Sequence, residues 1–133
     1  MRPFDVIVVS HGNLAEAMVD SACMICGDAE TVRTVGLHPV ESPESFTERL
    51  LAAISPNRPT LILSDLYGGT PHNVAMATAR RSEAIRCVSG VNLGLLLEAI
   101  TADETLDDAL VERLVALARE GVTELTSRAG SPS

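Results

Sequence analysis

Short apolar runs along the chain alternate with segments in which apolar residues recur every three or four positions. The runs are rich in β-branched residues and end at turn residues, which is typical of strands buried on both faces. The recurring segments predict amphipathic helices. Strands are predicted at residues 4–9, 31–37, 60–64, 84–89 and 122–126, and helices at residues 14–25, 43–54, 71–79, 93–100 and 106–120.

Two of the predicted helices begin with the same local signal. Ser42 precedes Pro43, and Thr70 precedes Pro71. A hydroxyl can accept a backbone hydrogen bond at a helix start, and proline fits the first helical position because the N–H there has no partner inside the helix. The sequence therefore predicts Ser42 and Thr70 as N-caps.

The regular alternation of strands and helices predicts an α/β fold. We expect a doubly wound, mostly parallel, flavodoxin-like sheet with helices on both faces, in one domain over residues 1–127. Residues 128–133 (RAGSPS) are expected to form a disordered C-terminal tail.

Charge and composition narrow the function. Ten arginines and eighteen acidic residues give a formal net charge of −8, and the 133 residues include no lysine, one Tyr and two Phe. Such a chain suits neither phosphate backbones nor stacked bases, so no nucleic-acid partner is expected. No apolar run approaches the ~20 residues that cross a bilayer, and the N-terminus does not resemble a signal peptide. We expect a cytoplasmic protein without direct membrane insertion.

Candidate functional residues follow the first, third and fourth predicted strands. In a doubly wound sheet, ligands bind at the carboxyl ends of the strands, where the strand order reverses. His11 follows the first strand, Asp65 the third, and Ser89 closes the fourth. These side chains are therefore expected at one crevice, together with the glycine turn of residues 68–70.

The types of these residues suit phosphoryl transfer. His11 lies before a predicted helix, whose N-terminus favours a bound anion and a neutral imidazole. Such an imidazole can act as nucleophile, while Asp65 fixes its tautomer and stabilises positive charge that develops on the ring. Backbone N–H groups of Gly68 and Gly69, with the Thr70 hydroxyl, can cradle phosphoryl oxygens. The residues alone also leave open a surface histidine beside an ordinary turn.

Three blocks of sequence carry a resemblance to a known family. Residues 8–15 (VVSHGNLA), 64–73 (SDLYGGTPHN) and 89–93 (SGVNL) resemble the IIA component of the mannose/fructose/sorbose-type sugar phosphotransferase system, in the order and spacing of that family. The resemblance spans about residues 4–126.

The resemblance implies specific roles. His11 matches the histidine that takes a phosphoryl group from the carrier protein HPr and passes it to a IIB component, and Asp65 matches the carboxylate paired with it. Gly69 and Thr70 match the phosphoryl-binding loop. The family is usually a homodimer that exchanges its C-terminal strand, which would be residues 122–126 here. IIB is expected on a separate chain, and no metal or cofactor is expected.

The chain departs from the family at two positions beside the expected site. His72 stands where the family commonly has an aromatic residue, and Gly94 where it commonly has proline. Both departures would alter partner fit more than chemistry. Two alternatives therefore remain within the family, a phosphodonor domain for a dihydroxyacetone kinase and a regulatory IIA protein whose phosphorylation state a partner senses.

Other phosphoryl-transfer folds fit the residues less well. A receiver domain would place its phosphoacceptor at Asp65, but it needs acidic residues after the first strand and a lysine that this chain lacks. A histidine phosphatase would need an arginine where Ser10 stands. The pair Cys23 and Cys26 falls at the end of a predicted helix, where the dipole does not favour a thiolate. We expect these cysteines, and Cys87, to be core residues.

Overall fold

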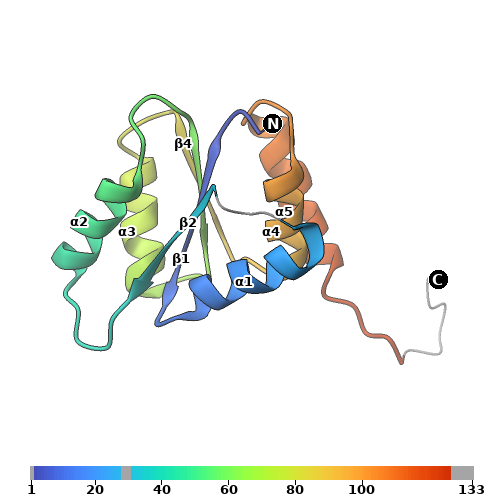
Figure 1. The fold of residues 1–133 in the computed structure, drawn as a ribbon, viewed down its shortest axis with the longest axis horizontal. Helices are drawn as coiled ribbons and strands as arrows, with labels where there is room; N and C mark the ends of the chain where they lie inside the picture. The colour runs from blue at the N-terminus through green and yellow to red at the C-terminus, as the bar shows by residue number, and fades with distance from the viewer. Residues whose placement is uncertain (1, 28–30, 127–133) are drawn as a thin grey trace.

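The computed structural model describes residues 2–27 and 31–126, which form one sheet with helices on both sides (Figure 1). The described elements are β1 (Asp5–His11), α1 (Leu14–Cys26), β2 (Val32–Leu37), α2 (Pro43–Ala53), β3 (Thr60–Ser64), α3 (Gly69–Ala79), β4 (Ile85–Ser89), α4 (Leu93–Thr101) and α5 (Asp108–Glu120). The expected doubly wound α/β architecture is confirmed.

The sheet has the strand order β2-β1-β3-β4, and all neighbouring pairs are parallel. The chain first moves from β1 outward to β2, then crosses back to β3 and β4. The direction therefore reverses between β1 and β3, which places the crevice of the fold at the carboxyl ends of these two strands.

Alternate residues of the strands build two apolar cores, one on each side of the sheet. Val6 and Val8 of β1 pack with α1, α4 and α5, while Ile7 and Val9 pack with α2 and α3. Figure 1 shows these two helical layers on either side of the strands. Burial on both faces explains why the strands read as continuous apolar runs.

The amino edge of the sheet is closed by an ion-pair cluster. Asp5 begins β1, and its side chain is 10% exposed. Its Oδ1 accepts a hydrogen bond from Arg58 Nε at 2.8 Å, and its Oδ2 lies 3.4 Å from Arg33 Nη1. Both carboxylate oxygens therefore have a cationic partner.

The structure extends the first strand beyond the predicted end at Val9. Ser10 and His11 continue the parallel ladder, opposite Gly36 and Leu37 of β2. A side chain at Gly36 would place its Cβ 2.1 Å from the carbonyl oxygen of Gly12, so only glycine lets the two strands approach this closely. The polar Ser10 is completely buried inside the strand.

Two further predictions, one about the start of α3 and one about a last strand, differ from the structure. Thr70 is not an N-cap, because the positive φ of Gly68 and Gly69 turns the chain into α3 earlier, with Gly68 at the cap position. Ser42 does cap α2 and accepts from the Ser45 N–H. Residues 122–126 form no strand, and no described strand pairs with this segment. The tail predicted at 128–133 lies outside the described residues.

Candidate functional site

The carboxyl ends of β1 and β3 hold His11 and Asp65 beside each other. His11 is the last residue of β1, and Asp65 directly follows β3. The Gly12 N–H donates to the Leu37 carbonyl at 2.8 Å, and the Asp65 N–H donates to the Val9 carbonyl at 3.1 Å. The ladder of the sheet therefore fixes the backbone under both side chains.

One carboxylate oxygen of Asp65 holds His11 at two points. Oδ2 lies 3.0 Å from the imidazole Nδ1 and 3.0 Å from the backbone N of His11. An ionised carboxylate only accepts hydrogen bonds, so Nδ1 carries a proton, and in the neutral ring Nε2 then keeps its lone pair. The His11 side chain is 47% exposed, whereas that of Asp65 is 7% exposed. The contact with Asp65 therefore selects the tautomer of the neutral imidazole in which Nε2 is available.

The second oxygen of Asp65 has a different environment. Oδ1 is buried and accepts no hydrogen bond from any of the described residues. Buried carboxylate oxygens are usually hydrogen-bonded, because an unpaired charge in a protein interior is costly. One of the two oxygens of this carboxylate therefore has no hydrogen-bond donor among the described residues.

The glycine turn before α3 lies directly against the imidazole. Gly69 has φ +83°, and a Cβ at this position would lie 3.2 Å from both Cε1 and Nε2 of His11. The cap residue Gly68 has no side chain, so no side-chain cap occupies the N–H groups of the first helical turn. Free N–H groups at a helix start bind anions. The turn therefore offers donors next to Nε2.

Ser10 positions the other helix start at this edge, a role that sequence reasoning missed. Its Oγ accepts a hydrogen bond from the Ala15 N–H at 2.8 Å, while Asn13 at the cap position of α1 makes no side-chain cap. A small polar residue that ends a buried apolar run just before a helix is the signal that points to this role.

Ser89 belongs to a neighbouring hydrogen-bonded group. Its Oγ lies 2.8 Å from Nδ1 of His72 and 3.2 Å from Oγ of Ser64. His72 is 6% exposed, and its ring contacts Tyr67 at 4.6 Å between centroids. The structure therefore brings His11, Asp65 and Gly69 together. Within the described residues, neither Ser89 nor Thr70 is hydrogen-bonded to His11.

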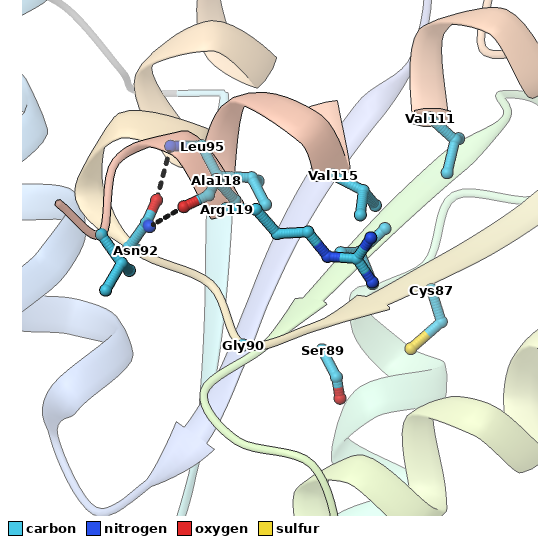
Figure 2. A pocket seen from close by; sticks show the side chains of 11 residues that line it. Cys87, Ser89, Gly90, Asn92, Leu95, Val111, Val115, Ala118 and Arg119 are labelled. Carbon is cyan, nitrogen blue, oxygen red and sulfur yellow. Dashed lines mark hydrogen bonds between the residues drawn. The ribbon is translucent and has the colours of Figure 1, made fainter. Parts of the chain in front are cut away.

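A groove of about 440 Å³ runs along the outer edge of β4 (Figure 2). Cys87 and Ser89 of β4 line one side of this groove, while Val111, Val115 and Arg119 of α5 line the other side and point toward the strand (Figure 2). No strand among residues 2–27 and 31–126 pairs with this edge of the sheet. The groove begins at the same carboxyl edge as the site.

The cysteines and acids gather at no metal site. In the part of the chain that the structure describes, no three His, Cys, Asp or Glu side chains could hold a metal ion together. Cys23, Cys26 and Cys87 are free thiols. Cys23 and Cys87 pack against the two cores, but all three are only partly buried, less than we expected. Burial raises the pKa of the Cys87 thiol to about 11.

The helices are too short or too polar for a bilayer. No candidate membrane span occurs over residues 2–27 and 31–126.

A family model described as "PTS system fructose IIA component" (EIIA-man) matches residues 5–116. The sorbose-specific EIIA component of Lacticaseibacillus casei is 31% identical over 127 residues, which cover 93% of this chain and 92% of that protein. The mannose-specific EIIAB component of Escherichia coli (strain K12) is 32% identical over 130 residues, but the matched region spans only 40% of its length.

Solved structures show the same similarity. The mannose/sorbose specific IIA subunit of the phosphotransferase system from Enterococcus faecalis superimposes with a TM-score of 0.89 at 32% identity, and the match covers 98% of this chain and 100% of that one. The phosphotransferase system component EIIA from Streptococcus agalactiae matches with a TM-score of 0.83 at 29% identity, over 91% of this chain and 96% of that one.

Proposed function

This chain belongs to the EIIA-man family of phosphotransferase-system IIA components, and from that premise we propose that it is a phosphocarrier, which accepts a phosphoryl group from HPr on His11 and passes it to a IIB component. The observation that carries the proposal is the Asp65–His11 pair, in which Nδ1 is held by Oδ2 and Nε2 faces the glycine turn.

The transfer step follows from this geometry. The Nε2 lone pair of His11 attacks phosphorus, a nitrogen–phosphorus bond forms, and the bond to the donor breaks with its electron pair leaving on the donor. The Nδ1 proton stays on the ring, so positive charge develops there beside the Asp65 carboxylate. The same steps in reverse deliver the phosphoryl group to IIB.

We propose that the glycine turn binds the phosphoryl oxygens. Donors that are already aimed at developing negative charge need no rearrangement during transfer. Gly68, Gly69 and Thr70 supply N–H groups at the start of α3, and the Thr70 hydroxyl makes no hydrogen bond to any residue in the described part of the chain. Ser89 is a further candidate for phosphoryl binding from its place at the end of the fourth predicted strand, although its hydroxyl is hydrogen-bonded to His72 and lies 3.2 Å from Ser64 Oγ.

We further propose a cytoplasmic homodimer in which residues 122–126 of a second copy add a strand to β4. Val122 is 82% exposed and Leu125 is 87% exposed, so this segment has apolar side chains with no place in the core of its own chain. The groove beside β4 offers apolar side chains and an unpaired strand edge. Unpaired edges readily accept another strand.

The deciding experiment for the carrier role is a phosphotransfer assay with labelled phospho-HPr as donor. We expect an acid-labile phosphoryl group on the protein, and its passage to a IIB protein in preference to a dihydroxyacetone-kinase subunit. The sugar-transport names of the relatives favour IIB as acceptor. Absence of labelling would refute the carrier role. Preferential transfer to the kinase subunit would show that the acceptor is this subunit and not a IIB component.

Light scattering tests the dimer separately. The chain mass is 14.0 kDa, so a dimer should scatter as a particle of about twice that mass. V122D/L125D should convert it to a monomer, while E112Q, on the exposed face of α5, should not. A monomeric wild-type protein at micromolar concentration would contradict the exchanged strand and leave the carrier role standing.

A further inference from the structure

A second histidine lies buried in the first turn of α3. His72 follows the glycine turn by only three residues and is 6% exposed. Its Nδ1 is 2.8 Å from Oγ of Ser89, which closes β4. The bond joins the start of α3 to the far end of β4, the strand that follows α3 in the chain. Neither the attack by Nε2 of His11 nor its pairing with Asp65 involves His72.

The His72–Ser89 bond is part of a small hydrogen-bonded group. Ser64 Oγ lies 3.2 Å from Ser89 Oγ and 3.5 Å from the Leu66 carbonyl oxygen. A serine hydroxyl can donate one hydrogen bond and also accept, so Ser89 can bond to Ser64 and to Nδ1 of His72 at the same time. The chain of bonds runs from β3 through β4 to α3.

The start of α3 has few other anchors. Gly68 at the cap position makes no side-chain hydrogen bond, and both Gly68 and Gly69 adopt positive φ. Glycine residues lose more conformational freedom on folding than other residues do. A turn built from two glycines is therefore stabilised by contacts that neighbouring residues make to it. The ring of His72 also contacts Tyr67, which lies between Asp65 and Gly68. His72 thus links the start of α3 to Tyr67, before the turn, and to Ser89 at the end of β4.

We propose that His72 is a positioning residue, which holds the glycine turn against Nε2 of His11 through its hydrogen bond to Ser89. This inference rests on the proposed carrier function for its effect on transfer, but not for its effect on the turn. In the absence of the bond, the turn samples positions in which its N–H groups no longer face His11. Small displacements of positioning groups lower rates strongly.

The test compares three variants that separate the hydrogen bond from the ring. H72F keeps the ring and its contact with Tyr67 but loses the bond to Ser89. H72N keeps an amide at the place of Nδ1 and loses the ring, whereas S89A removes the same bond from the other side. His38 has no side-chain hydrogen bond to a described residue, and H38N is therefore the matched control.

Two readouts follow each variant. In the unphosphorylated protein, ¹⁵N relaxation should show greater motion at Gly68, Gly69 and Thr70 in H72F and S89A, and the Nδ1 nitrogen of His72 should lose its hydrogen-bonded shift in S89A. In the transfer assay, H72F and S89A should lower kcat about 3- to 10-fold, the effect of one lost hydrogen bond, with little change in KM. H72N should restore most of the rate.

The outcomes distinguish the two proposals. An H72F protein with wild-type relaxation and wild-type kcat would overturn the positioning role, and so would an H72N protein as slow as H72F. If H72F does not fold, S89A and H72N decide the question. If wild-type protein takes no phosphoryl group from HPr, the carrier function fails, while the relaxation data still test the bond between His72 and the turn.

Discussion

Asp5 and Asp65 are buried carboxylates at opposite edges of one sheet, and their partners give them different uses. Asp5 faces Arg58 and Arg33, which occupy both of its oxygens. Asp65 faces one imidazole with Oδ2 and leaves Oδ1 without a partner among the described residues. Arginine stays charged at any relevant pH, whereas an imidazole can gain or lose charge during a reaction.

The difference separates a structural edge from an edge with a proposed reaction. At the amino edge, the partners of Asp5 are two arginines, which keep their charge, so the pairing stabilises the fold. At the carboxyl edge, the side-chain partner of Asp65 is an imidazole, which can carry positive charge in the proposed transfer. The same residue type therefore has a structural role at one edge and a proposed chemical role at the other.

The largest expected effect comes from removing the imidazole. H11A should abolish acid-labile labelling by phospho-HPr, because no other side chain among the described residues pairs with Asp65. Autoradiography measures the label on the protein. H38A is the control, because His38 is another exposed histidine at the same edge. An H11A protein that is still labelled would move the phosphorylation site elsewhere and end the distinction between the two edges.

A matched pair of glycine substitutions tests the turn. G69A should lower the transfer rate by about 10²-fold, because the new Cβ would lie 3.2 Å from Nε2 and displace the turn or the ring. G68A also places a side chain at a positive φ, which costs about 1–3 kcal/mol, but its Cβ meets nothing within 4 Å. Urea denaturation should show a loss of stability in both G69A and G68A. Phosphotransfer assays should show a slow rate for G69A only. Equal rates would contradict the assigned place of the turn.

Reciprocal aspartate substitutions compare the edges directly. D65N should slow phosphoryl transfer by about 10- to 100-fold, because the amide neither fixes the tautomer nor stabilises the charged ring. D5N should lower the free energy of unfolding by about 1–2 kcal/mol, as charged hydrogen bonds to Arg58 and Arg33 are lost, and should leave the transfer rate unchanged. Each variant is the control for the other, and a slow D5N protein would contradict the comparison.

The smallest effect concerns a carboxylate with an arginine partner at the carboxyl edge. The His38 backbone N–H, followed by Ser45 and Arg49, lowers the pKa of Glu41. The stabilisation is therefore present above the pKa of the unfolded carboxyl, near 4.3, and is lost as pH falls through the lower pKa of the folded state. E41Q should be less stable than wild type at pH 7, and this difference should shrink below pH 4. E48Q, an exposed α2 residue, should show no such trend.

Sequence reasoning predicted the fold and the closeness of His11 to Asp65 because both depend on local patterns. Continuous apolar strands indicated two covered faces, and the topology then placed His11 and Asp65 at one crevice. The spacing of residues in the sequence could not reveal that Gly36 lets β1 extend to His11. The reason is the close approach of Gly36, on β2, to the Gly12 carbonyl oxygen, which follows β1. The hydrogen bond between His72 and Ser89 likewise depends on the packing of α3 against β4, which no single segment encodes.

The position of His11 inside the β1 ladder limits how the protein can work as a carrier. The residue is paired with Leu37 in the sheet, so its backbone has no freedom to swing between two partners. In the proposed carrier role, a phosphoryl group on His11 would travel only when the whole molecule diffuses from donor to acceptor. Throughput would then be set by the number of copies of the protein and by how quickly each complex dissociates.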